Sequence, residues 1–205
     1  MTTARRRGRE TSETRGAILD AVERLMISDG YGSVSYRAVA TATGVTPGLV
    51  QYYFPGIDGL FEAAVRRRAE ENLQRLVAAL DSRPDEPLHV IWETSREEAS
   101  AALMTEFLAL ANHRKAIRSV IADVSERSRQ VQVEALRSAG TGRAQGLRPE
   151  DLAFLANGVP KVVGLEAGAG LRTRHDAVAK TCEKYIDVLE PRPRRSRRTA
   201  PSRSD

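Results

Sequence analysis

The segment from Ser33 to Phe61 carries a dense series of helix start and stop signals, which constrain the fold more than any other stretch of the chain. Ser35 and Thr46 are residue types that cap helix N-termini, and Pro47 suits a first helical position because it needs no N–H there. Gly44 lies where a helix can end in a left-handed residue without a steric penalty. These signals predict two short helices joined by a tight turn.

The two predicted helices, at about 36–43 and 47–53, have the length and spacing of a helix-turn-helix. Val39 and Val50 would face the interior, and Pro55-Gly56 breaks the chain before the next helix. In a helix-turn-helix, the second helix lies in the major groove of DNA. The segment therefore predicts a DNA-binding regulator.

The stretch from Ile18 to Val65 resembles the DNA-binding headpiece of the TetR (tetracycline repressor) family of bacterial regulators. The resemblance covers about a quarter of the chain and rests on many residues in the family order. These residues are Ile18, Val22, Leu25, Met26, Gly30-Tyr31, Ser35, Val39-Ala40, Gly44-Val45, Thr46, Pro47-Gly48, Tyr53-Phe54, Asp58 and Leu60.

The resemblance implies an all-α fold of about nine helices, with an N-terminal three-helix helix-turn-helix headpiece and a C-terminal helical domain for ligand binding and dimerisation. With the composition, it divides the chain into four parts. These are a flexible basic arm at 1–12, a DNA-binding domain at 13–56, a helical regulatory and dimerisation domain at 57–190, and a disordered basic tail at 191–205. Apolar residues recur at helical steps throughout the third part, whereas the tail lacks the apolar residues that a core needs.

Seven residues are candidates for DNA contact by their reach and their match to family positions: Arg37, Thr46, Gly48, Leu49, Gln51, Tyr52 and Tyr53. Gln51 can donate to a phosphate or read adenine, and Leu49 can contact a thymine methyl group. Tyr53 matches a phosphate-contacting family position, although packing against the first helix is an alternative. The family often has tyrosine at Gln51 and usually lysine at Ile57, so backbone N–H groups at the following helix start would have to bind a phosphate instead.

The positive charge of the chain is concentrated at its ends. The net charge is +5, but residues 1–16 contribute +3 and residues 191–205 contribute +5, which leaves −3 for the remainder. Between residues 17 and 61 only Arg24 and Arg37 are basic, against four acidic residues. Because phosphate neutralisation dominates DNA affinity, we expect the N-terminal arginines to follow the DNA backbone or enter the minor groove. A solubilising arm is the alternative.

Two further helices, at about 149–171 and 175–189, are the predicted dimer interface. The second carries an apolar stripe, and the first carries both apolar residues and several internal glycines that a close partner helix would explain. A kink at Pro160 is the alternative explanation for those glycines. The family pairs these helices with a second copy, and two recognition helices about 34 Å apart would read a palindrome.

Family members commonly bind a small molecule in the helical body, which moves the headpieces. Six residues are the candidate lining of such a site, with plain core packing as the alternative: Trp92, Met104, Phe107, Leu108, Asn112 and His113. The family's usual mode then predicts a repressor that a small-molecule ligand releases from its operator.

Other classes of protein find little support in the sequence. The three histidines are not spaced as metal ligands, no phosphate-binding glycine loop follows a strand, and no serine lies in a nucleophile elbow. We therefore expect no enzyme, no cofactor and no metal, with a helical-bundle enzyme or ligand carrier as the alternative. The single Cys182 and the lack of a membrane-length apolar stretch indicate a cytoplasmic protein without a membrane partner.

Overall fold

The computed structural model describes residues 2–98 and 101–191, and the side chains of residues 12–96 and 102–191. These parts form nine α-helices, two short 3-10 turns and no strand, which confirms the predicted all-α fold. The elements in chain order are α1 (Thr2–Asp29), η1 (Tyr31–Ser33), α2 (Tyr36–Thr43), α3 (Pro47–Tyr53), α4 (Ile57–Ser82), α5 (Pro87–Glu98), α6 (Ala101–His113), α7 (Lys115–Ala139), η2 (Arg143–Gln145), α8 (Pro149–Gly168) and α9 (His175–Leu189).

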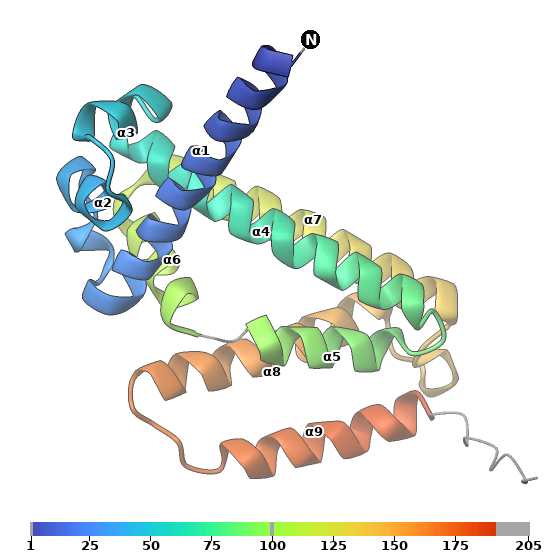
Figure 1. The fold of residues 1–205 in the computed structure, drawn as a ribbon. Coiled ribbons are helices and arrows are strands. Elements are labelled where there is room, and N and C mark those ends of the chain that lie inside the picture. Colours follow the sequence, from blue (N-terminus) through green and yellow to red (C-terminus); the bar gives the residue numbers. More distant parts are fainter. Residues whose placement is uncertain (1, 99–100, 192–205) are drawn as a thin grey trace, which may run out of the picture.

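The described helices form two groups, and two long helices connect these groups. Helices α4 and α7 run side by side along the molecule. Helices α1, α2 and α3 pack at one end of this pair, and α5, α8 and α9 form a layer below it in which α8 reaches back to α6 (Figure 1). Within the part of the chain described, no helix has the length and apolarity needed to cross a membrane.

Each end has its own apolar core. The first core combines buried side chains of α1–α3 and the start of α4 with side chains of α6 and the start of α7, among them Phe61, Leu110 and Ile117. The second combines the end of α4 with α5, the end of α7, α8 and α9, and includes Leu80 and Leu136. Packing therefore divides α4 and α7 along their length, rather than separating residues 13–56 from residues 57–190 as expected from the sequence.

The N-terminal segment also differs from the expectation. The sequence predicts a flexible arm at residues 1–12, but α1 is helical from Thr2 onward and passes without a break into the headpiece. No proline interrupts residues 2–29, and arginine and glutamate are good helix formers, so the buried part of the helix can propagate outward. Of the expected tail at 191–205, residues 192–205 lie outside the described residues.

Candidate nucleic-acid interface

The turn between α2 and α3 has the predicted local geometry. The Ala38 N–H donates to the Ser35 hydroxyl at 3.2 Å, and the Leu49 N–H donates to the Thr46 hydroxyl at 3.3 Å. Gly44 ends α2 in the left-handed region with φ 74°, where a side chain would be strained. The two caps and the turn are therefore confirmed, and short-range signals alone are enough to specify them.

The inner faces of the two helices are anchored in the first core. Val39 and Val50 are completely buried, and Phe54 is 4% exposed. In addition, the Tyr36 hydroxyl donates to the Phe54 carbonyl oxygen at 2.9 Å, which ties the first turn of α2 to the residue after α3. This hydrogen bond spans 18 residues, and no short-range signal in the sequence predicts it. It holds the recognition helix at a fixed angle to α2.

Six of the seven predicted DNA contacts lie on the exposed surface of this pair. Thr46, Gly48 and Gln51 are exposed, as is Arg37 on α2. The remaining two exposed candidates are apolar or aromatic, with Leu49 37% and Tyr52 78% exposed.

The seventh candidate, Tyr53, is half-buried against the first core. Its ring meets the Tyr52 ring edge-on, with 5.6 Å between the centroids. The packing role considered for Tyr53 is therefore present in the structure, and its ring also supports an exposed neighbour.

Helix α4 begins without the cation that the family usually has there. Ile57 is half-buried and packs against the first core. The next residue, Asp58, forms an ion pair with Arg114 at the start of α7, and the Arg114 guanidinium also lies 5.4 Å from the centre of the Phe61 ring. The carboxylate in the first turn of α4 is therefore neutralised by a residue far away in the sequence.

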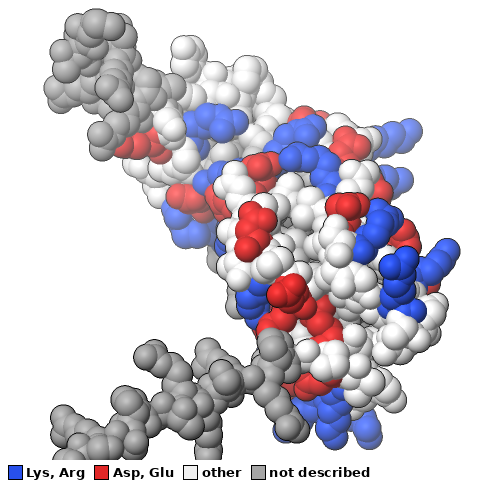
Figure 2. Space-filling view, turned by 90° about the vertical axis from the view of Figure 1, so that its right-hand side faces the viewer, with Lys and Arg blue, Asp and Glu red and all other residues white. Residues whose placement is uncertain are grey.

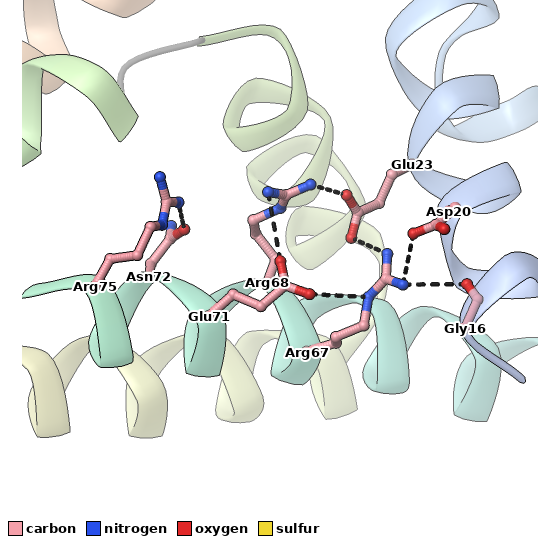
Figure 3. Close-up of polar contacts among 8 residues, drawn as sticks. All are labelled: Gly16, Asp20, Glu23, Arg67, Arg68, Glu71, Asn72 and Arg75. Carbon is pink, nitrogen blue, oxygen red and sulfur yellow. Dashed lines mark hydrogen bonds and ion pairs between the residues drawn. The ribbon is translucent and has the colours of Figure 1, made fainter. Parts of the chain in front are cut away.

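A second group of ion pairs joins α1 to α4 (Figure 3). Arg67 lies 2.7 Å from the Asp20 carboxylate and 2.8 Å from the Glu23 carboxylate, and it donates to the Gly16 carbonyl oxygen at 3.1 Å. Arg68 contacts the other oxygen of Glu23, which is only 4% exposed. Burial lowers the pKa of Arg67, but hydrogen bonds to Glu23 and Asp20 outweigh it, so this pKa lies above its ordinary value.

These contacts change the charge balance of the headpiece. Counted between residues 17 and 61, acidic side chains outnumber basic ones. In the folded chain, however, Arg67, Arg68 and Arg114 neutralise three of the four acidic residues from outside that range. On the face shown in Figure 2, Lys and Arg are likewise interspersed with Asp and Glu. The headpiece is therefore less repulsive to DNA than its own sequence suggests.

Arg15 is a candidate contact that the sequence did not single out. Its guanidinium lies 5.2 Å from the centre of the Phe54 ring, so a cation of α1 is placed beside the end of α3. Figure 1 shows the N-terminal part of α1 projecting beyond the headpiece on this side. The only sequence signal for Arg15 is its membership of the N-terminal arginine run.

The six candidate ligand residues are not brought together. Trp92 is buried in the second core, whereas Phe107 is buried in the first. Leu108, Asn112 and His113 are exposed, and Met104 is half-buried. The six therefore do not line one cavity, because the helical period that suggested them continues from one core into the other.

The last two helices leave a broad apolar face uncovered. The exposed side chains, each between 38% and 67% accessible, are Phe154, Leu155, Val162, Leu165, Val178, Tyr185 and Val188. The predicted stripe on α9 is divided, since Ile186 is buried in the second core while Tyr185 points outward. Several large exposed apolar side chains on two consecutive helices are typical of an interaction surface.

Comparison with known proteins agrees with this geometry. Residues 18–64 match the family described as bacterial regulatory proteins, tetR family. The HTH-type transcriptional regulator AcrR of Shigella flexneri is 33% identical over 110 residues, which are 49% of this chain and 51% of that protein. The match thus spans about half the length of this curated relative.

Solved structures resemble the chain over most of its length. A TetR-family transcriptional regulator from Rhodococcus sp. is 20% identical, with a TM-score of 0.70 over 87% of this chain and 99% of that one. A regulator from Pseudomonas aeruginosa PAO1 is 21% identical, with a TM-score of 0.71 over 88% and 91%. A regulator from Saccharomonospora viridis in complex with choline is 20% identical, with a TM-score of 0.67 over 86% and 96%. At these identities the likeness concerns the fold.

Proposed function

Since this chain belongs to the TetR family of transcriptional regulators, we propose that it is a repressor that binds a palindromic operator as a homodimer and leaves it when a small molecule binds. The observation that carries the proposal is the exposed outer face of α3, which is capped by Thr46 and anchored beneath by Val50. Such a rigid, accessible helix is what insertion into a major groove requires. The proposal places the protein with the chromosome in the cytoplasm.

The exposed side chains of α2 and α3 suit both parts of DNA recognition. Gln51 offers an amide to a base edge, and Leu49 offers an apolar contact to a thymine methyl group. Arg37 and the Tyr52 hydroxyl would bind phosphates and set the register. Gly48 lets the backbone approach the groove closely. Arg15 extends the set toward the arginine-rich end of α1.

The uncovered apolar side chains of α8 and α9 support the proposed homodimer. A second copy would cover Phe154, Leu155 and Tyr185 together with their neighbours on that face. One recognition helix reads only a few base pairs, whereas two copies related by a two-fold axis would read two half-sites of a palindrome. We therefore assign α1–α3 to DNA contact and α8–α9 to pairing.

A small-molecule effector would bind in the helical body. Of the six sequence candidates, Trp92 has the best support, because its buried indole N–H has no hydrogen-bond partner within the described part of the chain. One structural neighbour holds choline. Binding near α5 would shift the helices that connect the second core to the headpiece.

The test begins with selection of bound duplexes from a random library by the full-length protein. We expect a palindromic sequence, bound with one dimer per site and with submicromolar affinity in a fluorescence-anisotropy titration. The double variant Gln51→Ala/Tyr52→Ala should lose sequence preference while keeping its helical content, and Asn72→Ala on α4 is the matched control. Enrichment of no sequence above the starting library would overturn the proposal.

A further inference from the structure

Helix α9 is weakly held by apolar contacts within its own chain. Of its side chains only Ile186 is buried, while Cys182 and Leu189 are half-buried beside it. Figure 1 shows α9 along the edge of the molecule, next to α5 and α8. A short helix with so little buried surface needs other contacts to hold its position.

The residue that follows α9 supplies such contacts. The Glu190 carboxylate is buried, with 6% of the residue exposed, and accepts backbone N–H groups of Leu88 and His89, each at 2.9 Å. The Thr141 hydroxyl donates to it at 3.1 Å, and the His89 Nδ1 lies 2.7 Å from it. Glu190 therefore caps the first turn of α5 and joins that turn to α9 and to the segment after α7.

His89 adds a second contact between α5 and α9. Its Nε2 lies 2.9 Å from Asp187, one helical turn before Glu190. Both neighbours of the ring are carboxylates, so the His89 ring lies between a carboxylate of α9 and the carboxylate that caps the first turn of α5.

Two cations near this connection, Arg83 and Arg96, each have acidic partners of their own. Arg83 lies near Glu190 but is engaged with Glu93 at 2.5 Å and Glu86 at 3.8 Å. The hydrogen bond to Glu93 and the charges of Glu86 and Glu190 keep the pKa of Arg83 above its ordinary value despite partial burial. Closer to the start of α9, Glu183 pairs with Arg96 of α5 at 2.5 Å on the exposed surface.

We propose that Glu190 and His89 are positioning residues of the dimer interface: they fix the end of α9 against α5, so that Val178, Tyr185 and Val188 are presented to a second copy in one orientation. The inference rests on the proposed homodimer. It adds a polar connection within one copy, between α9 and the first turn of α5.

The test measures the dimer dissociation constant of the full-length protein by sedimentation equilibrium. Glu190→Gln keeps the size of the side chain but places an NH2 donor in a site surrounded by donors, and we expect the constant to rise at least tenfold. Amide exchange of α9 should accelerate in this variant, and operator affinity should be unchanged at concentrations where it is fully dimeric. Glu183→Gln, on the exposed surface of the same helix, is the matched control and should change the constant less than twofold.

A dimer constant for Glu190→Gln within twofold of the wild type would overturn the inference. If that variant fails to fold, His89→Gln serves instead, and a dimer constant within twofold of the wild type in it would count against the proposal. A wild-type chain that is monomeric at all concentrations would contradict the homodimer itself. A wild-type dimer that ignores DNA would contradict the repressor alone and leave this inference standing.

Discussion

Helices α3 and α9 both expose much of their surface, but the side chains proposed for binding differ: α3 offers hydrogen-bonding groups beside Leu49, and α9 offers an apolar stripe. On α3 the apolar residue Val50 is buried, and the exposed set includes the polar groups of Thr46, Gln51 and Tyr52. On α9, by contrast, Val178, Tyr185 and Val188 remain exposed although Ile186 is already buried. A face with hydrogen-bonding groups suits a hydrated DNA groove, whereas an apolar face suits another protein surface.

The two regions also differ in how they are held. The helix-turn-helix is stabilised by short-range caps and by a core that surrounds it, whereas α9 depends on polar contacts with α5 about 100 residues earlier in the chain. The exposed face of α3 is thus positioned mainly by interactions between nearby residues, whereas that of α9 is positioned by contacts with residues far away in the sequence. Substitutions on α3 should therefore weaken DNA binding without weakening pairing, whereas loss of pairing should weaken both.

The largest effect is expected from the double substitution Tyr185→Glu/Val188→Glu. Two carboxylates on each copy would meet their symmetry mates in the apolar face, and such like-charge contacts cost several kcal/mol. We expect a monomer in sedimentation velocity and a loss of operator affinity of at least about 100-fold, or about 3 kcal/mol. Ser138→Glu, at an exposed position of α7, is the control. A variant that stays dimeric would show that pairing uses another surface.

A smaller effect is expected when residues 1–9 are deleted, because four arginines are removed. Each DNA phosphate that these arginines no longer neutralise should reduce the slope of log affinity against log salt by about 0.9, and operator affinity at low salt should fall about tenfold or more. Anisotropy titrations between low and moderate salt provide the measurement. Identical slopes for the full and shortened chains would assign this segment to solubility instead.

The substitution Glu23→Gln should affect stability. It leaves Arg67 and Arg68 with a weaker partner between α1 and α4, but their side chains are 20% and 35% exposed, so solvent screens part of the loss. We expect the free energy of unfolding to fall by about 1–2 kcal/mol in urea titrations. Glu71→Gln, whose side chain is 46% exposed, should change it by less than about 0.5 kcal/mol. Equal losses of unfolding free energy in Glu23→Gln and Glu71→Gln would contradict the idea that burial makes the Glu23 ion pairs stronger.

The smallest effect is expected for Arg37→Ala. Arg37 is exposed on α2, so stability should stay within about 0.5 kcal/mol of the wild type. Operator affinity should fall by about 1 kcal/mol, or about fivefold, if its guanidinium binds DNA. Arg24→Ala, on the exposed side of α1, is the matched substitution. Unchanged affinity for Arg37→Ala would remove this residue from the interface.

Much of the fold could be read from local patterns. Ser35, Gly44, Thr46 and Pro47 specify the helix-turn-helix because capping and left-handed turns depend on neighbouring residues only. The candidate contacts on α3 followed from this local geometry together with the resemblance to family positions. The six candidate effector residues do not lie together in the structure. Helical spacing predicts which side chains are buried, but it does not predict which of the two cores receives each of them.

The sequence by itself determined the two short helices of the helix-turn-helix, their caps and most of the exposed outer face of α3, since these depend on interactions within a few residues. Only the tertiary structure decided which charges meet. The pairing of Arg67 with Glu23, of Arg114 with Asp58 and of Glu190 with the start of α5 joins residues 44 to 102 positions apart. No periodic pattern marks such pairs, because a charged side chain looks the same in the sequence whether water or a distant helix surrounds it.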